Sequence, residues 1–124
     1  MKYYTETHEW IDVEGSEGRI GLSAHAAAEL GDITFIELPD VGAVLQGGDI
    51  LGQVESVKTA NDIYAPAGCR VTEVNAAIED APELVNESPE ENGWICKVAD
   101  VNEGDLSALR TEKKYEQFLS RNEH

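Results

Sequence analysis

Lys58 stands apart from the other basic side chains of this 124-residue chain. It is the only lysine or arginine between Arg19 and Arg70, whereas acidic residues are frequent in that interval. They are Glu29, Asp32, Glu37, Asp40, Asp49, Glu55 and Asp62. An accessible amine can form an amide with a carboxylic cofactor, and the long, flexible lysine side chain gives such a group reach. An ordinary solvated lysine is the alternative, since most lysines are exposed.

The segments around Lys58 predict how its amine is held. Residues 50–57 and 63–66 are typical of β-strands, and the polar residues 58–62 between them are typical of a hairpin tip. Further strands are expected at residues 10–14, 19–22, 33–38, 69–74 and 94–98. Many short strands separated by turns predict a mainly β fold, either a sandwich or a barrel.

Two helices are expected beside these strands. Ser23 is a suitable N-cap for a short helix over residues 24–30, which Gly31 would end. Tyr115, Phe118 and Leu119 have helical spacing and predict an amphipathic C-terminal helix that packs against the sheet. No linker divides the chain, so we expect residues 1–124 to form a single domain with one core.

The charge of the chain excludes several classes of function. Nine basic against 25 acidic residues give a formal net charge of -16. Binding to nucleic acid or to an anionic membrane needs clustered basic residues, so we expect neither, and we expect partners with basic surfaces. No apolar run approaches the roughly 18 residues of a membrane-spanning helix. The N-terminus lacks the features of a secretory or transit peptide, so we expect a cytoplasmic protein.

Apart from Lys58, the sequence offers little support for a metal site or a catalytic site. Cys69 and Cys96 form no CxxC pair and lie near no histidine cluster, so we expect two buried thiols and no metal site. The chain contains no nucleophile elbow and no glycine-rich phosphate loop. We therefore expect no catalytic residue and a protein that is not an enzyme. An interaction module with an unmodified Lys58 is a further alternative.

Around Lys58, the sequence ESVKTAND (residues 55–62) resembles the lipoylation signature of the H-protein family of the glycine cleavage system. Further blocks similar to that family occur in order from residue 3 to residue 118. They are HEW at 8–10, GLS at 21–23, HA at 25–26, LGDI at 30–33, ELP at 37–39, VG at 41–42, YAP at 64–66, EVN at 73–75, PELVN at 82–86 and NGW at 92–94. So many blocks in the right order are not expected by chance.

The resemblance implies both a fold and a covalent cofactor. The fold is a lipoyl/biotinyl-type barrel-sandwich hybrid of two small antiparallel sheets, with a short helix and a C-terminal helix. Lipoate is attached to Lys58 through an amide. Glu9 and His25 match family positions that line the cleft in which the loaded arm rests. Glu55 and Asp62 flank Lys58, and we expect them either to be recognised by the lipoyl-attaching enzyme or to be solvated hairpin charges.

The resemblance also implies three enzyme partners besides the lipoyl-attaching enzyme. The arm would accept an aminomethyl group from glycine decarboxylase (the P-protein) and pass its carbon to aminomethyltransferase (the T-protein). Dihydrolipoamide dehydrogenase (the L-protein) would then reoxidise the arm. The carrier, expected to be a monomer, catalyses nothing itself, because the cofactor supplies the chemistry.

Two other carrier functions are compatible with the pattern. Departures from the family, such as Gly68-Cys69 in place of a Ser-Gly pair, leave open an H-like lipoyl carrier for lipoate relay or sulfur oxidation. A biotinyl carrier shares the fold, but such domains usually bracket the lysine with methionines. Val57 and Thr59 flank Lys58 here, which disfavours biotin.

Overall fold

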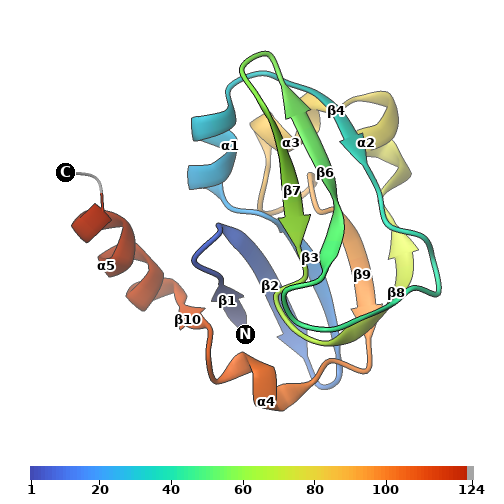
Figure 1. The fold of residues 1–124 in the computed structure, drawn as a ribbon, viewed down its shortest axis with the longest axis vertical. Helices are drawn as coiled ribbons and strands as arrows, with labels where there is room; N and C mark the ends of the chain where they lie inside the picture. Colours follow the sequence, from blue (N-terminus) through green and yellow to red (C-terminus); the bar gives the residue numbers. More distant parts are fainter. Residues whose placement is uncertain (123–124) are drawn as a thin grey trace.

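The computed structural model describes residues 1–122, and it contains two antiparallel β-sheets that pack face to face (Figure 1). Within the described residues, seven strands form the larger sheet in the order β10-β1-β2-β3-β9-β8-β5. They are β1 (Lys2–Tyr4), β2 (Glu9–Glu14), β3 (Glu17–Leu22), β5 (Val44–Leu45), β8 (Cys69–Val74), β9 (Cys96–Ala99) and β10 (Arg110–Thr111). The smaller sheet has the order β4-β6-β7 and consists of β4 (Ile33–Glu37), β6 (Ile50–Ser56) and β7 (Ala60–Tyr64). The predicted mainly β fold is confirmed.

Five helices surround the sheets within the same part of the chain. They are α1 (Ala24–Leu30), α2 (Ala76–Asp80), α3 (Glu83–Glu87), α4 (Glu103–Leu106) and α5 (Glu112–Asn122). The predicted short helix is α1: the Ser23 hydroxyl accepts the Ala26 N–H at 3.1 Å, and Gly31 ends the helix with a φ of 73°. The predicted C-terminal helix is α5, whose Tyr115 is buried.

The core lies between the two sheets and takes apolar side chains from both. Ile11, Ile20 and Val71 from the larger sheet meet Ile36 and Ile63 from the smaller one. All five are almost fully buried, as expected when alternate residues of two facing sheets point inward.

Both thiols lie in this core and are free, as the sequence predicts. Burial raises the pKa of Cys69 to about 11 and that of Cys96 to about 12. Both groups are therefore neutral and unreactive at neutral pH. The unusual Cys69 is thus a core residue and lies away from Lys58.

A second, smaller cluster fixes the C-terminal helix to β1 and β2. Tyr4, Trp10 and Tyr115 are buried together, and the rings of Tyr4 and Tyr115 are stacked with their centroids 4.3 Å apart. Trp10 packs closely on Gly21, where a Cβ atom would lie 2.7 Å from the indole ring. Any larger residue at position 21 would therefore displace Trp10 and the strand that begins at Glu9.

The structure corrects several predicted boundaries and adds elements that the pattern missed. The strand expected at residues 63–66 is β7, which covers residues 60–64. The hairpin tip covers residues 57–59, not 58–62, because the Ser56 hydroxyl accepts the N–H groups of both Lys58 and Thr59 and closes the turn at once. The predicted strand at residues 94–98 begins only at Cys96, since Trp94 belongs to the preceding loop. The short strands β1, β5 and β10 and the helices α2, α3 and α4 were not predicted.

Candidate functional site

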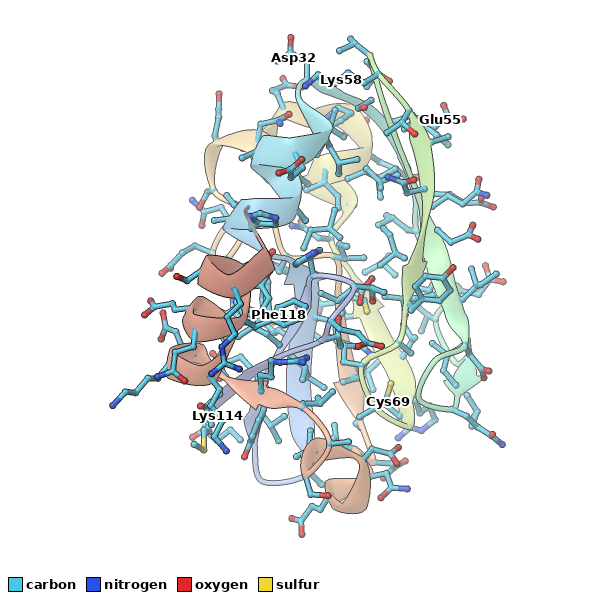
Figure 2. The ribbon with its side chains drawn as sticks, turned by 60° about the vertical axis from the view of Figure 1, so that its left-hand side comes forward. Asp32, Glu55, Lys58, Cys69, Lys114 and Phe118 are labelled. Atoms are coloured by element: carbon cyan, nitrogen blue, oxygen red, sulfur yellow. The ribbon has the colours of Figure 1, made fainter. Side chains whose placement is uncertain are left out.

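Lys58 is exposed at the tip of the β6–β7 hairpin, at one end of the molecule (Figure 2). The two N–H groups that follow Val57 each donate to the Ser56 hydroxyl at 3.2 Å, and the Ser56 N–H donates to the Thr59 carbonyl at 2.8 Å. The backbone at the root of the lysine is therefore held in one conformation, and the lysine itself is exposed to solvent.

The turn after α1 supports this tip from the side. The Val57 N–H donates to the Asp32 carbonyl at 3.0 Å. Lys58 also lies over Gly31, where a Cβ atom would be 3.3 Å from Lys58 Cε and 3.6 Å from its Nζ. Figure 2 shows Lys58 and Asp32 side by side at the end of α1. Two elements therefore position the lysine: the hairpin holds its backbone, and the end of α1 contacts its side chain.

Asn86 of α3 braces the same turn, and the sequence analysis gave it no role. Its side-chain amide donates to the Gly31 carbonyl at 2.7 Å, and its amide oxygen accepts the Ile33 N–H at 2.9 Å. Asn86 therefore holds the backbone on both sides of Asp32. Its place in the PELVN block was the only signal in the sequence that could have drawn attention to it.

A cavity of about 490 Å³ lies below the hairpin tip, between the hairpin, α1 and the segment that precedes β2. Its lining residues are Thr7, His8, Glu9, Leu22, His25, Ala26, Glu29, Leu30, Val54, Thr59, Asn61 and Asp62. Three of the predicted site residues, Glu9, His25 and Asp62, share this cavity. Lys58 and Glu55 do not line it.

The two acids that flank Lys58 therefore differ in their surroundings. Asp62 lines the cavity and accepts a hydrogen bond from the Gln53 side chain at 3.1 Å. Glu55 is exposed on β6, directly opposite Ala60 of β7 and Phe35 of β4. A single role for both carboxylates does not follow from their positions.

Glu9 is a carboxylate in a closed environment, with an exposed fraction of 1%. Its Oε1 atom accepts the hydroxyl groups of Thr5 and Thr7, both at 2.5 Å, and its Oε2 atom accepts the Tyr64 N–H at 3.3 Å. Burial raises the pKa of Glu9, and these hydrogen bonds oppose the rise. Because Oε2 has only one long hydrogen bond, it retains the capacity to accept a further donor.

Five polar residues that line the cavity were not predicted as site residues: Thr7, His8, Glu29, Thr59 and Asn61. His8 lies against His25, with ring centroids 4.7 Å apart, and His25 Nε2 is 3.7 Å from Glu29 Oε1. His8 stands in the HEW block beside Glu9, but residue type and spacing alone do not distinguish it from a surface histidine.

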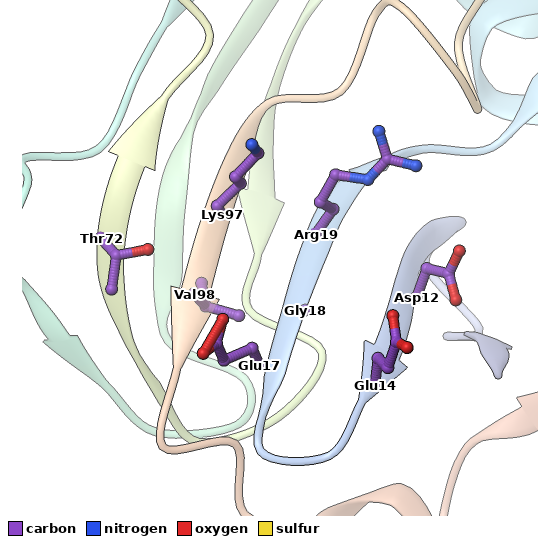
Figure 3. A pocket seen from close by; sticks show the side chains of 8 residues that line it. All are labelled: Asp12, Glu14, Glu17, Gly18, Arg19, Thr72, Lys97 and Val98. Carbon is purple, nitrogen blue, oxygen red and sulfur yellow. The ribbon is translucent and has the colours of Figure 1, made fainter.

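A second hollow, of about 440 Å³, lies on the larger sheet next to the β2–β3 turn (Figure 3). Its lining residues are Asp12, Glu14, Glu17, Gly18, Arg19, Thr72, Lys97 and Val98. Acidic and basic side chains are mixed in it, and it lies at the other end of the molecule from the hairpin tip (Figure 1). Among the described residues, no group of three or more His, Cys, Asp or Glu side chains could hold a metal ion.

None of the helices in the described part of the chain is both long enough and apolar enough to cross a membrane.

Comparison with known proteins gives one consistent result. The model of the glycine cleavage H-protein family matches residues 2–122, a range that contains Lys58 and every residue that lines the cavity. The chain is 50% identical to a glycine cleavage system H protein of Brevibacillus brevis over 116 residues, which cover 94% of this chain and 92% of that protein. It is 40% identical to one of Thermotoga maritima over 120 residues, 97% of each chain. The crystal structure of a glycine cleavage system H protein from Mycobacterium marinum superposes with a TM-score of 0.85, at 35% identity and 96% coverage of each chain.

Proposed function

The chain belongs to the glycine cleavage H-protein family, whose members are lipoyl carriers rather than enzymes, and from that membership we propose that Lys58 carries the lipoyl group. The resemblance of the sequence to this family and the expected barrel-sandwich fold are thereby confirmed. The chain is therefore a carrier of the glycine cleavage system, and its own surface has no reaction to catalyse.

The observation that carries the proposal for Lys58 is the combination of an exposed amine with a fixed root. The amine can be reached by a modifying enzyme, while the bonds at Ser56 and Asp32 hold the backbone from which an arm would swing. Once bound, the lipoyl group supplies the sulfur atoms that take up and release the one-carbon unit. The protein raises the effective concentration of that unit at each partner through a tether.

We propose that the cavity receives the free end of the arm with its amine cargo. An aminomethyl group ends in an amine that is positively charged at neutral pH, and the carboxylates of Glu9, Glu29 and Asp62 line the cavity. Glu9 Oε2 is the best placed acceptor, because Thr5 and Thr7 already occupy Oε1 and fix the carboxylate. A charged amine beside a fixed carboxylate forms the stronger kind of hydrogen bond.

Recognition by the lipoyl-attaching enzyme is proposed for the outer side of the hairpin. Glu55 is exposed there, close in sequence to Lys58, and is the better candidate of the two flanking acids. Asp62 lines the cavity, so we propose that it acts on the cargo more than on the modifying enzyme. The P-, T- and L-proteins are the proposed later partners, with residues 1–124 acting as one domain.

Intact-mass measurement tests the central proposal. Protein incubated with lipoate, ATP and a lipoyl ligase should gain the mass of one lipoyl group, and Lys58→Arg should gain none. Lys113→Arg is the matched control, because Lys113 is also exposed but lies on α5, and it should be modified as the wild type is. An unmodified wild-type protein, or equal modification of Lys58→Arg, would overturn the assignment.

A glycine–bicarbonate exchange assay with P-protein tests the pathway separately. Lipoylated protein should support the exchange. A fully lipoylated protein that is inert in this assay would instead favour another lipoate-dependent route.

A further inference from the structure

Tyr115 of the C-terminal helix reaches the cavity from outside, through its hydroxyl group. The hydroxyl oxygen lies 2.6 Å from His8 Nδ1 and 2.8 Å from Ser23 Oγ. The ring is buried and stacked on Tyr4, so the position of this hydroxyl is fixed. The contact with Ser23, the N-cap residue of α1, joins α5 to the start of that helix. Neither Tyr115 nor Ser23 lines the cavity, whereas His8 does.

Only one arrangement of the hydrogen atoms of Ser23, Tyr115 and His8 gives both hydroxyl groups an acceptor among the described residues. Ser23 Oγ accepts the Ala26 N–H, which leaves its own hydrogen free to donate to the Tyr115 oxygen. Tyr115 then donates to His8 Nδ1. In the reverse direction, no acceptor among the described residues would receive the hydrogen of the fully buried Ser23 hydroxyl. The satisfied arrangement makes Nδ1 of His8 an acceptor and places the ring proton on Nε2.

The backbone of His8 is also held in place. Its φ of 74° lies in the left-handed region, which non-glycine residues seldom adopt. Two backbone hydrogen bonds maintain this conformation: the His8 N–H donates to the Thr5 carbonyl at 3.2 Å, and its carbonyl accepts the Ser23 N–H at 2.9 Å. Such strain persists where the surrounding structure fixes it, often at functional sites.

We propose that Tyr115 is a positioning residue for the cavity: its hydroxyl oxygen accepts a hydrogen bond from Ser23, its hydroxyl group donates one to Nδ1 of His8, and this bond holds His8 as the neutral imidazole. This inference rests on the proposed function of the cavity as the site for an amine cargo.

The charge of the cavity explains why a neutral His8 matters. Among the described residues, the lining contains no lysine or arginine, so His8 and His25 are its only groups that can become cationic. The carboxylates of Glu9, Glu29 and Asp62 face the same space from β2, α1 and β7. On the outer side, Tyr115 and Phe118 of α5 lie against His8, and Arg110 of β10 stacks on Phe118 at 4.0 Å. A protonated His8 would offset one carboxylate and repel a cationic amine.

The electrostatic surroundings agree with this role. Burial lowers the pKa of His8, the neighbouring His25 lowers it further, and only Glu29 opposes the effect. Burial raises the pKa of Tyr115, while its hydrogen bond with Ser23 acts in the other direction, as expected if Ser23 donates to the tyrosine oxygen.

Histidine NMR on unmodified, ¹⁵N-labelled protein tests whether Tyr115 sets the protonation of His8. Long-range proton–nitrogen spectra between about pH 5 and about pH 8 report which ring nitrogen carries the proton. In the wild type, His8 should be protonated at Nε2 and should titrate below about 6.5. In Tyr115→Phe, the preference for Nε2–H should be lost and the midpoint should rise towards about 6.5. His8→Gln assigns the resonance.

Tyr4→Phe is the matched control, since Tyr4 belongs to the same stacked pair but its hydroxyl donates to Glu90. It should leave the His8 titration unchanged. A proton on Nδ1 in the wild type, an unchanged titration in Tyr115→Phe, or an equal change in Tyr4→Phe would overturn the proposal. Because Lys58 is unmodified in this experiment, its result does not depend on whether the protein is lipoylated. In amine-loaded protein, Tyr115→Phe should release the cargo about twofold faster or more near pH 6, where a larger share of His8 is charged.

Discussion

The Val57 N–H donates to the Asp32 carbonyl at 3.0 Å, and this bond joins the tip of the lysine hairpin to the end of α1. Both elements line the cavity, Thr59 from the hairpin and Leu30 from α1. A backbone contact therefore joins the root of the proposed arm to the end of a helix that lines its proposed resting place. Substitutions other than proline at position 57 leave this backbone contact in place, but they can strain the turn that makes it.

Gly31→Ala should strain that turn and disturb Lys58. Alanine at a φ of 73° and a ψ of -154° should cost about 1–3 kcal/mol of stability, measured by urea denaturation. Its methyl group would also press on Lys58 Cε, so the Lys58 side-chain NMR signals should shift. Gly48→Ala is the control, because Gly48 has a φ of 91° but no atom within 4 Å of the place where a Cβ atom would lie. It should lose similar stability and leave the Lys58 signals unchanged; the same shift in both variants would contradict the contact.

Asn86→Ala should loosen the turn from the other side. It removes the hydrogen bonds to Gly31 and Ile33, so the free energy of unfolding should fall by about 1–3 kcal/mol. Amide hydrogen exchange at Ile33 should accelerate as well. The exposed Asn92 offers a comparison: Asn92→Ala should change stability by no more than about 0.5 kcal/mol. Equal losses in the two variants would show that Asn86 has no special bracing role.

Glu9→Gln should change how stability depends on pH. The folded-state pKa of Glu9 is raised above its ordinary value of 4.5, so the folded protein binds more protons than the unfolded chain in the window above 4.5. The contribution of Glu9 to stability is therefore largest below that value and is lost as the pH rises through the folded-state pKa. Unfolding curves across this range should show that Glu9→Gln gains stability relative to the wild type as the pH increases. A constant difference between the two proteins would mean that Glu9 is not perturbed by burial.

Salt should weaken the encounters of the lipoylated protein with its partners. The net charge of -16 steers it towards basic surfaces, and added salt screens this attraction over distances of about 10 Å at 0.1 M. Transfer rates measured at limiting partner concentration should fall as KCl is raised, whereas sucrose at equal osmolality should not reproduce the fall. Rates that are independent of salt would indicate that docking depends on apolar contacts alone.

The sequence predicted those parts of the fold that have local signals. Ser23 and Gly31 mark the two ends of α1, and the apolar strands on either side of Lys58 predict the hairpin. Short strands such as β1 and β10 escaped prediction because they are stabilised by pairing with distant parts of the chain and carry too few residues for a pattern.

The candidate site likewise combines residues that local motifs predict with supporting contacts that they do not. Lys58, Glu9, His25, Glu55 and Asp62 were selected from motifs, and their roles stay predictions until they are measured. The contacts that support the site join residues far apart in the chain: Asn86 and Gly31 are separated by 55 positions, and Tyr115 and His8 by 107. No local pattern encodes such contacts, since they depend on how the sheets and helices pack.

The position of Lys58 over Gly31 gives the modification an electrostatic consequence. The last turn of α1 contains no basic residue, so the ammonium group of Lys58 lies near the negative pole of a helix that has no cation of its own there. Amide formation abolishes that charge and with it the attraction to the helix end. The reaction that attaches the cofactor thus also frees the side chain that must carry it.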